Sequence, residues 1–118
     1  MKKQDRDPIL FIEDIEISIS KIFDYTNNMK RAVFLKNDLV KDGVIRNFEI
    51  IGEATRNIPT SLKEKYPDTP WETMYRLRNI VSHEYFSVDY ESVWNIIKEY
   101  LPDNKKQIEH ILQIERKS

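Results

Sequence analysis

Cysteine is absent from this chain of 118 residues, and glycine occurs only twice. Without cysteine, neither a disulfide framework nor a thiolate metal site can form. A β-sheet protein of this size would use more glycine in its turns, so the shortage of glycine favours helices. No apolar run approaches the roughly 20 residues of a membrane-spanning helix, and the mixed charges at the N-terminus do not resemble a signal peptide. We therefore expect a cytoplasmic protein that does not enter a membrane.

The chain also has no excess of either sign of charge. It contains 19 lysines and arginines and 20 acidic residues, so its formal net charge is −1. Proteins that coat nucleic acid regardless of sequence carry a strong basic excess, so that class is disfavoured. This charge balance is compatible with a small basic cleft, which a dimer could build from two modest patches. The composition, 40% apolar and 33% charged, is typical of a single helical domain over residues 1–118. We expect about seven N-terminal and about four C-terminal residues to fray.

The spacing of apolar residues predicts an all-α, up-and-down bundle of four or five helices. The first helix opens at Asp7-Pro8, a capping residue followed by proline at the first helical position, and weakens or ends near residues 26–28. The second covers 35–57 and stops before Pro59. Gly52 lies near its centre, where glycine costs about 1 kcal/mol relative to alanine. We expect the close approach of another helix to compensate for that cost.

Four further helical segments complete the expected bundle. A short turn follows Ser61, which forms a predicted capping box with Glu64. The third main helix begins with Thr69 as its N-cap and carries an apolar stripe with an arginine on the same line: Trp71, Met74, Arg78, Val81 and Tyr85. The fourth helix follows residues 87–89, and Pro102 either breaks the chain or opens a fifth helix.

The segment 78–85 brings together side chains suited to phosphate chemistry. Arg78 offers the fixed fork of donors that binds phosphate, and His83 is the side chain type that moves protons near neutral pH. Tyr85 lies seven residues after Arg78 and is nearly eclipsed with it, whereas His83 lies about 140° away on an ideal helix. Either the helix bends or unwinds near its end, or a second subunit completes the site.

Each of these residues also has a structural interpretation. Arg78 could form a salt bridge to Glu53, His83 could meet the last carbonyls of its helix, and Tyr85 could be a core aromatic. Asn79 could hold the arginine or a phosphate oxygen, or face solvent. Three other basic side chains, Arg46, Arg56 and Arg76, either border an RNA cleft or form exposed ion pairs; of these, Arg46 and Arg76 are the predicted RNA contacts.

No metal or cofactor is expected. His110 has no second histidine at ligand spacing, so a metal site is disfavoured. The chain also lacks the glycine-rich loops that bind nucleotides.

The ordered set of motifs resembles a known family. The motif Arg78-Asn79-x-x-x-His83-x-Tyr85 resembles the Arg-x(4–6)-His motif of HEPN domains, and its His-x-Tyr ending resembles the HepT branch, toxins of MNT–HEPN toxin–antitoxin systems. Segments at 46–54, 71–79, 84–86 and 93–94 resemble other signatures of that branch, and the match spans roughly residues 9 to 112.

The resemblance implies a HEPN-like helical homodimer in which two motifs face one cleft. It implies an endoribonuclease toxin that cleaves RNA without metal, through attack of the ribose 2′-hydroxyl on the adjacent phosphate. Arg78 would bind that phosphate and stabilise its growing charge, and His83 would act as general acid or base or orient the nucleophile. Asn79 would support their geometry.

The resemblance also implies a partner, a minimal nucleotidyltransferase antitoxin of a type VII-like pair, which transfers AMP from ATP to Tyr85. A phosphate ester beside Arg78 would occupy the anion site and repel the RNA backbone. Two other readings remain open. The chain could be a non-catalytic helical module that binds substrate for a nucleotidyltransferase, or a purely structural dimer.

Overall fold

The computed structural model of the protein describes residues 6–82 and 88–117, and every regular element within these residues is helical. The predicted all-α fold is therefore confirmed. The elements in chain order are α1 (Pro8–Thr26), α2 (Arg31–Lys36), α3 (Asp38–Asn57), α4 (Thr60–Lys65), α5 (Trp71–Tyr75), a 3₁₀ turn (Arg76–Arg78), α6 (Asn79–Ser82), α7 (Tyr90–Asn95), a π-helical stretch (Ile96–Tyr100) and α8 (Leu101–Arg116).

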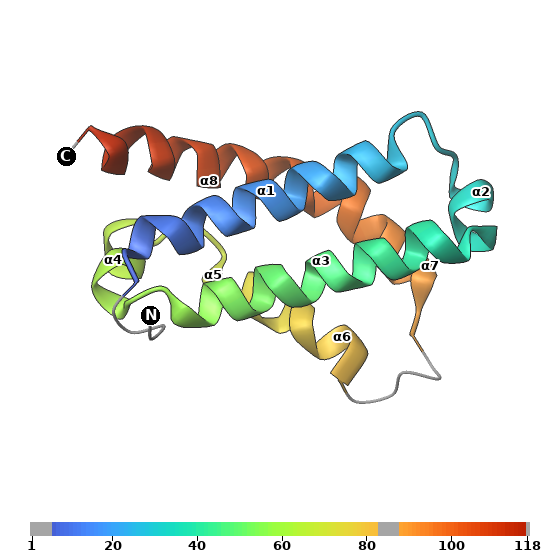
Figure 1. Cartoon of the computed structure of the whole chain (residues 1–118), viewed down its shortest axis with the longest axis horizontal. Helices are drawn as coiled ribbons and strands as arrows, with labels where there is room; N and C mark the ends of the chain where they lie inside the picture. The colour runs from blue at the N-terminus through green and yellow to red at the C-terminus, as the bar shows by residue number, and fades with distance from the viewer. Residues whose placement is uncertain (1–5, 83–87, 118) are drawn as a thin grey trace.

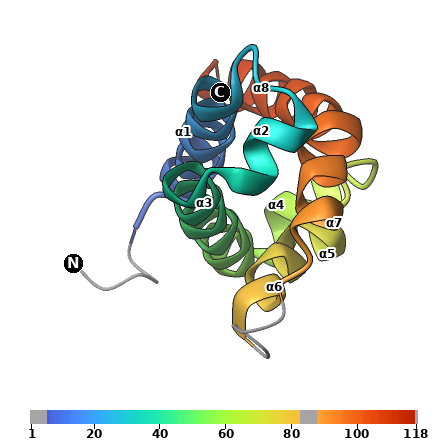
Figure 2. The ribbon, with the colours of Figure 1, turned by 90° about the vertical axis from the view of Figure 1, so that its right-hand side faces the viewer.

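Three long helices, α1, α3 and α8, run along the long axis of a rod of 44 × 28 × 25 Å (Figure 1). α1 packs against both α3 and α8, while α5, the 3₁₀ turn and α6 pack against another side of α3. Seen along the axis, α2 lies across one end of the bundle (Figure 2). Its Phe34 is fully buried, with its ring 5.1 Å from that of Trp94 in α7. The chain thus forms one continuous core around α3.

The predicted limits of the first two main helices are confirmed at three of four points. The Asp7 carboxylate accepts a hydrogen bond from the Ile9 backbone N–H at 3.0 Å, and α1 ends at Thr26. The second helix ends at Asn57, just before Pro59. It begins at Asp38 rather than at residue 35, because the Asn37 side chain caps it by accepting a hydrogen bond from Val40 N–H. Residues before Asn37 form α2, a short helix that the sequence did not predict.

Two predicted N-caps are wrong. α4 begins at Thr60 after Pro59 and has no side-chain cap, so Ser61 lies inside the helix and forms no capping box with Glu64. α5 begins at Trp71 after Pro70, again without a side-chain cap. Thr69 is buried, and its carbonyl oxygen accepts a hydrogen bond from Trp71 N–H at 2.8 Å. In both places proline already fixes the backbone before the helix, so no side-chain cap is needed to start it.

The third main helix is interrupted by the 3₁₀ turn Arg76–Arg78. In this tighter turn Leu77 takes the inward position and is 5% exposed, three residues after the buried Met74. Arg78 therefore does not lie on the buried stripe as expected, and its side chain is 33% exposed. The sequence predicts that this helix bends or unwinds near its end if Arg78 and His83 act together. The helix does depart from ideal geometry, but the departure is a 3₁₀ turn that ends at Arg78.

Residues 90–116 form one helical run. Asp89 caps α7 by accepting hydrogen bonds from the hydroxyl and the backbone N–H of Ser92 and from the backbone N–H of Glu91, and this bonding lowers the pKa of the Asp89 carboxyl. Pro102 opens α8 and does not break the chain. The predicted inner residues of these helices are buried: Val93, Trp94, Ile97, Leu101, Ile108, Ile111 and Leu112.

The end of α8 is held by neighbouring elements. The Glu115 carboxylate accepts hydrogen bonds from the Tyr66 hydroxyl and the Lys65 ammonium, which lowers the pKa of Glu115. Burial and the same hydrogen bond raise the pKa of Tyr66 to about 12. Arg116 bridges to Glu13 of α1 at 2.8 Å. Through these side chains, residues 115 and 116 join α8 to α1 and to the end of α4.

Candidate active site

Arg78 is positioned by its close packing against α3. A Cβ added to Gly52 would lie 2.7 Å from the Arg78 Cβ, 2.7 Å from the Tyr75 carbonyl oxygen and 2.9 Å from the Arg78 backbone nitrogen. Any larger residue at position 52 would therefore push the 3₁₀ turn away from α3. The close approach expected at Gly52 is confirmed, and its partner is the segment that carries the motif arginine.

The guanidinium of Arg78 faces a carboxylate and an aromatic ring. Its Nη1 lies 3.6 Å from Oε2 of Glu53, and its Cζ lies 5.6 Å from the centre of the Tyr75 ring. Glu53 also pairs with Arg56 at 3.3 Å. The structural interpretation of Arg78 as a partner of Glu53 is thus correct. The pair is a third exposed on both sides, so the guanidinium remains accessible to an anion from solvent.

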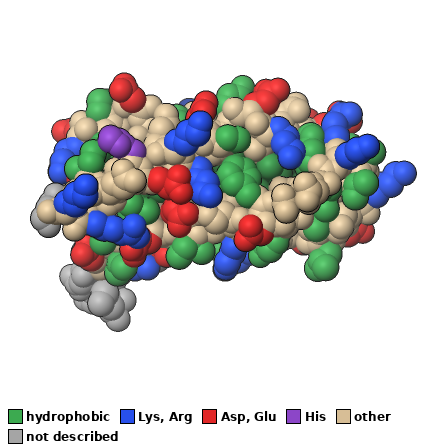
Figure 3. All heavy atoms as spheres, turned by 90° about the horizontal axis from the view of Figure 1, so that it is seen from above, with side chains coloured by type: hydrophobic (Ala, Val, Ile, Leu, Met, Phe, Trp, Pro, Cys, Tyr) green, Lys and Arg blue, Asp and Glu red, His purple; other side chains and the backbone are tan. Residues whose placement is uncertain are grey.

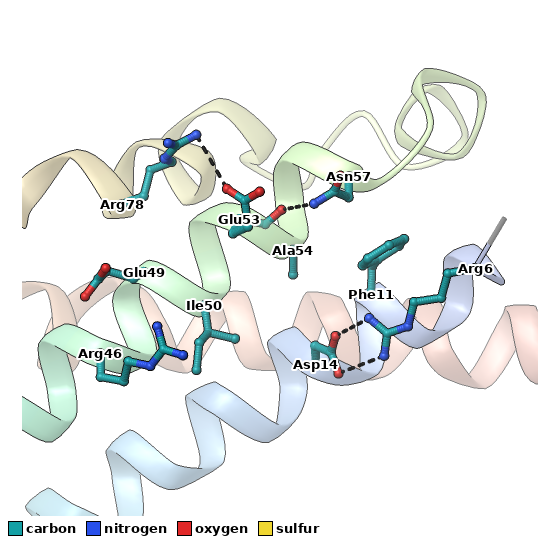
Figure 4. A pocket seen from close by; sticks show the side chains of 10 residues that line it. All are labelled: Arg6, Phe11, Asp14, Arg46, Glu49, Ile50, Glu53, Ala54, Asn57 and Arg78. Atoms are coloured by element: carbon teal, nitrogen blue, oxygen red, sulfur yellow. Dashed lines mark hydrogen bonds and ion pairs between the residues drawn. The ribbon is translucent and has the colours of Figure 1, made fainter. Parts of the chain in front are cut away.

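The Arg78–Glu53 pair lies at the edge of a hollow of about 400 Å³ between α1 and α3 (Figure 4). We call this feature the hollow. Its lining comes from three parts of the chain and is listed here: Arg6, Phe11, Asp14, Arg46, Glu49, Ile50, Glu53, Ala54, Asn57 and Arg78. Most of these residues recur every three or four positions along α3, so they form one stripe of that helix.

The two arginines predicted to contact RNA differ in their surroundings. Arg46 lines the hollow, is exposed and makes no ion pair with another described residue. Arg76 pairs with Glu72 at 3.1 Å, and both side chains are 69% exposed. The structure therefore groups Arg46 with Arg78 and leaves Arg76 outside the hollow.

Away from the hollow, the surface carries no single-sign field on the face that Figure 3 shows. Lysine and arginine side chains alternate there with aspartate and glutamate over α1 and α8 (Figure 3). This mixture agrees with the near-zero net charge of the chain. An anion would consequently be attracted by local basic groups such as Arg46 and Arg78, and not by the overall charge of the chain.

The remaining motif residues are only partly described. Asn79 begins α6 directly after the 3₁₀ turn, and its backbone N–H bonds to the carbonyl oxygens of Arg76 and Leu77. Its half-buried side chain makes no hydrogen bond with another described residue. His83 and Tyr85 lie outside the described residues, so their predicted roles stay predictions.

Sequence reasoning did not find that Glu49 and Phe11 line the same hollow as Arg78. The available signal was the spacing of Arg46, Glu49, Glu53 and Asn57, which places all four on one face of a helix. The contribution of α1 had no comparable signal, because it depends on how two helices pack.

Two classes of feature are absent from residues 6–82 and 88–117. No helix there is sufficiently long and apolar to cross a bilayer. Nor do three or more potential metal-ligating side chains gather at one point in that part of the chain.

Comparison with known proteins gives a consistent result. The family model described as "Ribonuclease HepT-like" matches residues 15–111. "Putative RNase MJ0127" of Methanocaldococcus jannaschii is 40% identical over 92% of this chain and 89% of its own length. "Putative RNase MJ1380" of the same organism is 41% identical over 88% and 95%. "Probable ribonuclease HepT" of Thermococcus cleftensis is 37% identical over 94% and 98%.

No solved structure shows a significant match to the chain. The family match covers most of the described fold and includes the 3₁₀ turn and the residues of α3 that line the hollow. The accessible guanidinium of Arg78 at the edge of the hollow also suits a protein that acts on phosphodiesters. The chain belongs to the HepT-like ribonuclease family.

Proposed function

We propose that this protein is a metal-independent endoribonuclease toxin that acts as a homodimer. The observation that carries the proposal is the accessible guanidinium of Arg78 at the edge of the hollow, in a chain whose relatives are named as ribonucleases. Arginine can bind two non-bridging phosphate oxygens at once. Arg46 on the same hollow, and Arg76 beyond it, would contact the RNA backbone on either side.

In the proposed reaction the ribose 2′-oxygen attacks the adjacent phosphorus. The bond from phosphorus to the 5′-oxygen breaks, which leaves a 2′,3′-cyclic phosphate and a 5′-hydroxyl end. One group must take the 2′-hydroxyl proton and another must protonate the leaving 5′-oxygen. His83 serves one of these roles, and its copy in the second subunit is available for the other. Arg78 stabilises the charge that grows on the phosphate oxygens, and Asn79 supports this geometry.

Arg78 must exchange partners for this to happen. In the free protein its guanidinium lies 3.6 Å from Glu53, which is longer than a charge-assisted hydrogen bond. Partly exposed ion pairs contribute only about 0–1 kcal/mol. A phosphate that offers two oxygens in bidentate geometry can therefore displace the carboxylate.

Control of the toxin would come from a nucleotidyltransferase antitoxin. The phenolic oxygen of Tyr85 attacks the α-phosphorus of ATP, so that AMP is joined to Tyr85 and pyrophosphate leaves. The added phosphate would compete for Arg78 and repel the RNA backbone.

A second function is favoured by one specific observation. The ion pair between Arg78 and Glu53 is what a purely structural arginine would make. On this reading the chain binds substrate for a nucleotidyltransferase and does not cleave RNA.

Cleavage assays in excess chelator separate the two functions. The parent should cut single-stranded RNA to cyclic phosphate ends, whereas Arg78→Ala and His83→Ala should lose cleavage while keeping the helical circular dichroism spectrum of the parent. If either variant cuts as fast as the parent, the catalytic assignment is wrong. Tyr85→Phe should fold but should accept no label from α-labelled ATP in the presence of the nucleotidyltransferase. Label on that variant would place the modification elsewhere.

A further inference from the structure

The hollow has an apolar floor beneath a polar rim. Phe11 and Ala54 are each 5% exposed and form the floor together with Ile50 (Figure 4). Its volume of about 400 Å³ lies within the range of sites that hold small ligands. The guanidinium of Arg6 lies over the Phe11 ring, 4.7 Å from its centre. A nucleobase in the hollow would therefore pack against Ile50, Ala54 and this guanidinium, because unpaired bases stack on apolar side chains and on the planes of arginine side chains.

The charges around the rim do not suit phosphate alone. Three arginines and three carboxylates line the hollow, so their formal charges cancel. Arg6 is paired with Asp14 at 2.6 Å, and Arg78 is paired with Glu53. These carboxylates would weaken binding if the hollow held only the RNA backbone, because each one repels phosphate.

Two acceptors on the rim remain available. Glu49 makes no ion pair or hydrogen bond with another described residue. The amide nitrogen of Asn57 donates to the Glu53 carbonyl oxygen at 2.8 Å, which leaves the amide oxygen of Asn57 without a described donor. Glu49 lies one helical turn from Glu53, about 6 Å along the axis of α3. An acceptor therefore lies within the reach of one nucleotide from the phosphate site at Arg78.

We propose that the hollow receives one unpaired RNA base next to the phosphate bound by Arg78, and that Glu49 accepts a hydrogen bond from the exocyclic amino group of that base. Cytosine, adenine and guanine carry such a group. Uracil does not, and its single donor on that edge, N3–H, is flanked by two carbonyl oxygens that a carboxylate repels. This inference rests on the proposed nuclease function and adds base selection to it.

The preference can be measured with a pool of single-stranded RNAs that contain a randomised stretch, cleaved in chelator and sequenced at the new ends. We expect one position beside the cut to be depleted in uracil by about tenfold relative to cytosine. Glu49→Gln should reduce that depletion to about twofold or less, because an amide can donate to the uracil oxygens as well as accept. Replacing guanine by hypoxanthine at this position, which removes the amino group, should slow cleavage by the parent but not by Glu49→Gln.

The matched control is Glu64→Gln, because Glu64 is an exposed carboxylate on α4 outside the hollow. It should keep both the cleavage rate and the base preference of the parent. If Arg78-dependent cleavage shows no uracil depletion, or if Glu49→Gln keeps the depletion unchanged, the base-binding hollow is wrong while the nuclease function stands. If the parent does not cleave the pool, or cleaves it as fast as Arg78→Ala, the nuclease function itself fails.

Discussion

Gly52 and Arg78 touch where the 3₁₀ turn crosses α3, and the space between them is too small for a methyl group. An added Cβ at position 52 would lie 2.7 Å from the Arg78 Cβ and 2.7 Å from a backbone carbonyl oxygen. Neither neighbour is the far end of a flexible side chain, so relief requires movement of the backbone. The position of the motif arginine thus depends on the absence of a side chain on another helix.

We predict that Gly52→Ala lowers both stability and RNA cleavage. The overpacking should cost about 1–3 kcal/mol, which exceeds the roughly 1 kcal/mol that alanine gains over glycine inside a helix. Gly43→Ala is the matched control, because its Cβ would meet only the side chain of Tyr25, at 3.1 Å, and that ring is 40% exposed and can shift. Urea unfolding and cleavage rates should separate the two variants, and equal behaviour would contradict the prediction.

Removing the carboxylate beside Arg78 should strengthen RNA binding. In Glu53→Gln the guanidinium no longer exchanges a negative partner for the phosphate, and one repulsive charge leaves the rim. We expect the Kd for an RNA with a 2′-deoxy substitution that blocks cleavage to fall severalfold. Fluorescence anisotropy measures this Kd directly. Weaker binding by Glu53→Gln would instead mean that Glu53 holds Arg78 in the geometry that binds RNA.

The two remaining candidate RNA contacts should differ in strength. Arg46→Ala should weaken RNA binding and reduce the slope of log Kobs against log salt by about one charge. Arg76→Ala should have a smaller effect, because Arg76 lies outside the hollow that Arg46 and Arg78 line. Titrations at several salt concentrations check both slopes, with Arg31→Ala on α2 as a control outside the hollow. An equal loss for Arg46→Ala and Arg31→Ala would argue against an RNA contact at the hollow.

The contact between Glu115 and Tyr66 should make stability depend on pH. The folded pKa of Glu115 is lower than its unfolded value near 4.5 because Tyr66 and Lys65 donate hydrogen bonds to its carboxylate. The resulting stability is present above that unfolded pKa and is lost as the pH falls through the folded pKa. Glu115→Gln should therefore lower the free energy of unfolding by about 1–2 kcal/mol near neutral pH, and the difference should shrink in acid.

Urea unfolding near pH 7 and near pH 3 measures that change. Glu64→Gln, on the surface of α4, should differ little from the parent at either pH. At the alkaline end the sign is opposite, because the pKa of Tyr66 is raised to about 12. Its contribution is present below the ordinary tyrosine value of 10.0 and is lost as the pH rises through about 12. A constant difference between Glu115→Gln and the parent across the acid range would contradict the assignment.

The sequence predicted those features that depend on local chemistry. Asp7-Pro8 began the first helix where expected, and Pro59 follows the end of α3. Gly52, one of the two glycines of α3, correctly predicted a close contact with another segment. The helical class followed from apolar periodicity, which reports the buried face of each element.

Features that depend on packing between distant segments were not predicted. The 3₁₀ turn places Arg78 on the outside and Leu77 on the inside of the helix. No proline or glycine close to this turn in the sequence indicates it. The short helix α2 was missed because its single buried residue, Phe34, shows no periodicity by itself. The hollow required the packing of α1 on α3, which places Phe11 beside residues more than thirty positions away in the chain.

The salt bridge between Arg116 and Glu13 puts the last turn of α8 beside the first turns of α1, at one pole of the rod (Figure 1). Tethers attached at residues 6 and 117 would pull these two helices apart from the same side. The α1–α8 interface would then open from one end, so the force would act on one layer of contacts at a time and would not be shared along the whole interface. Mechanical extension through these points should therefore strip α1 and α8 from each other before it disturbs α3.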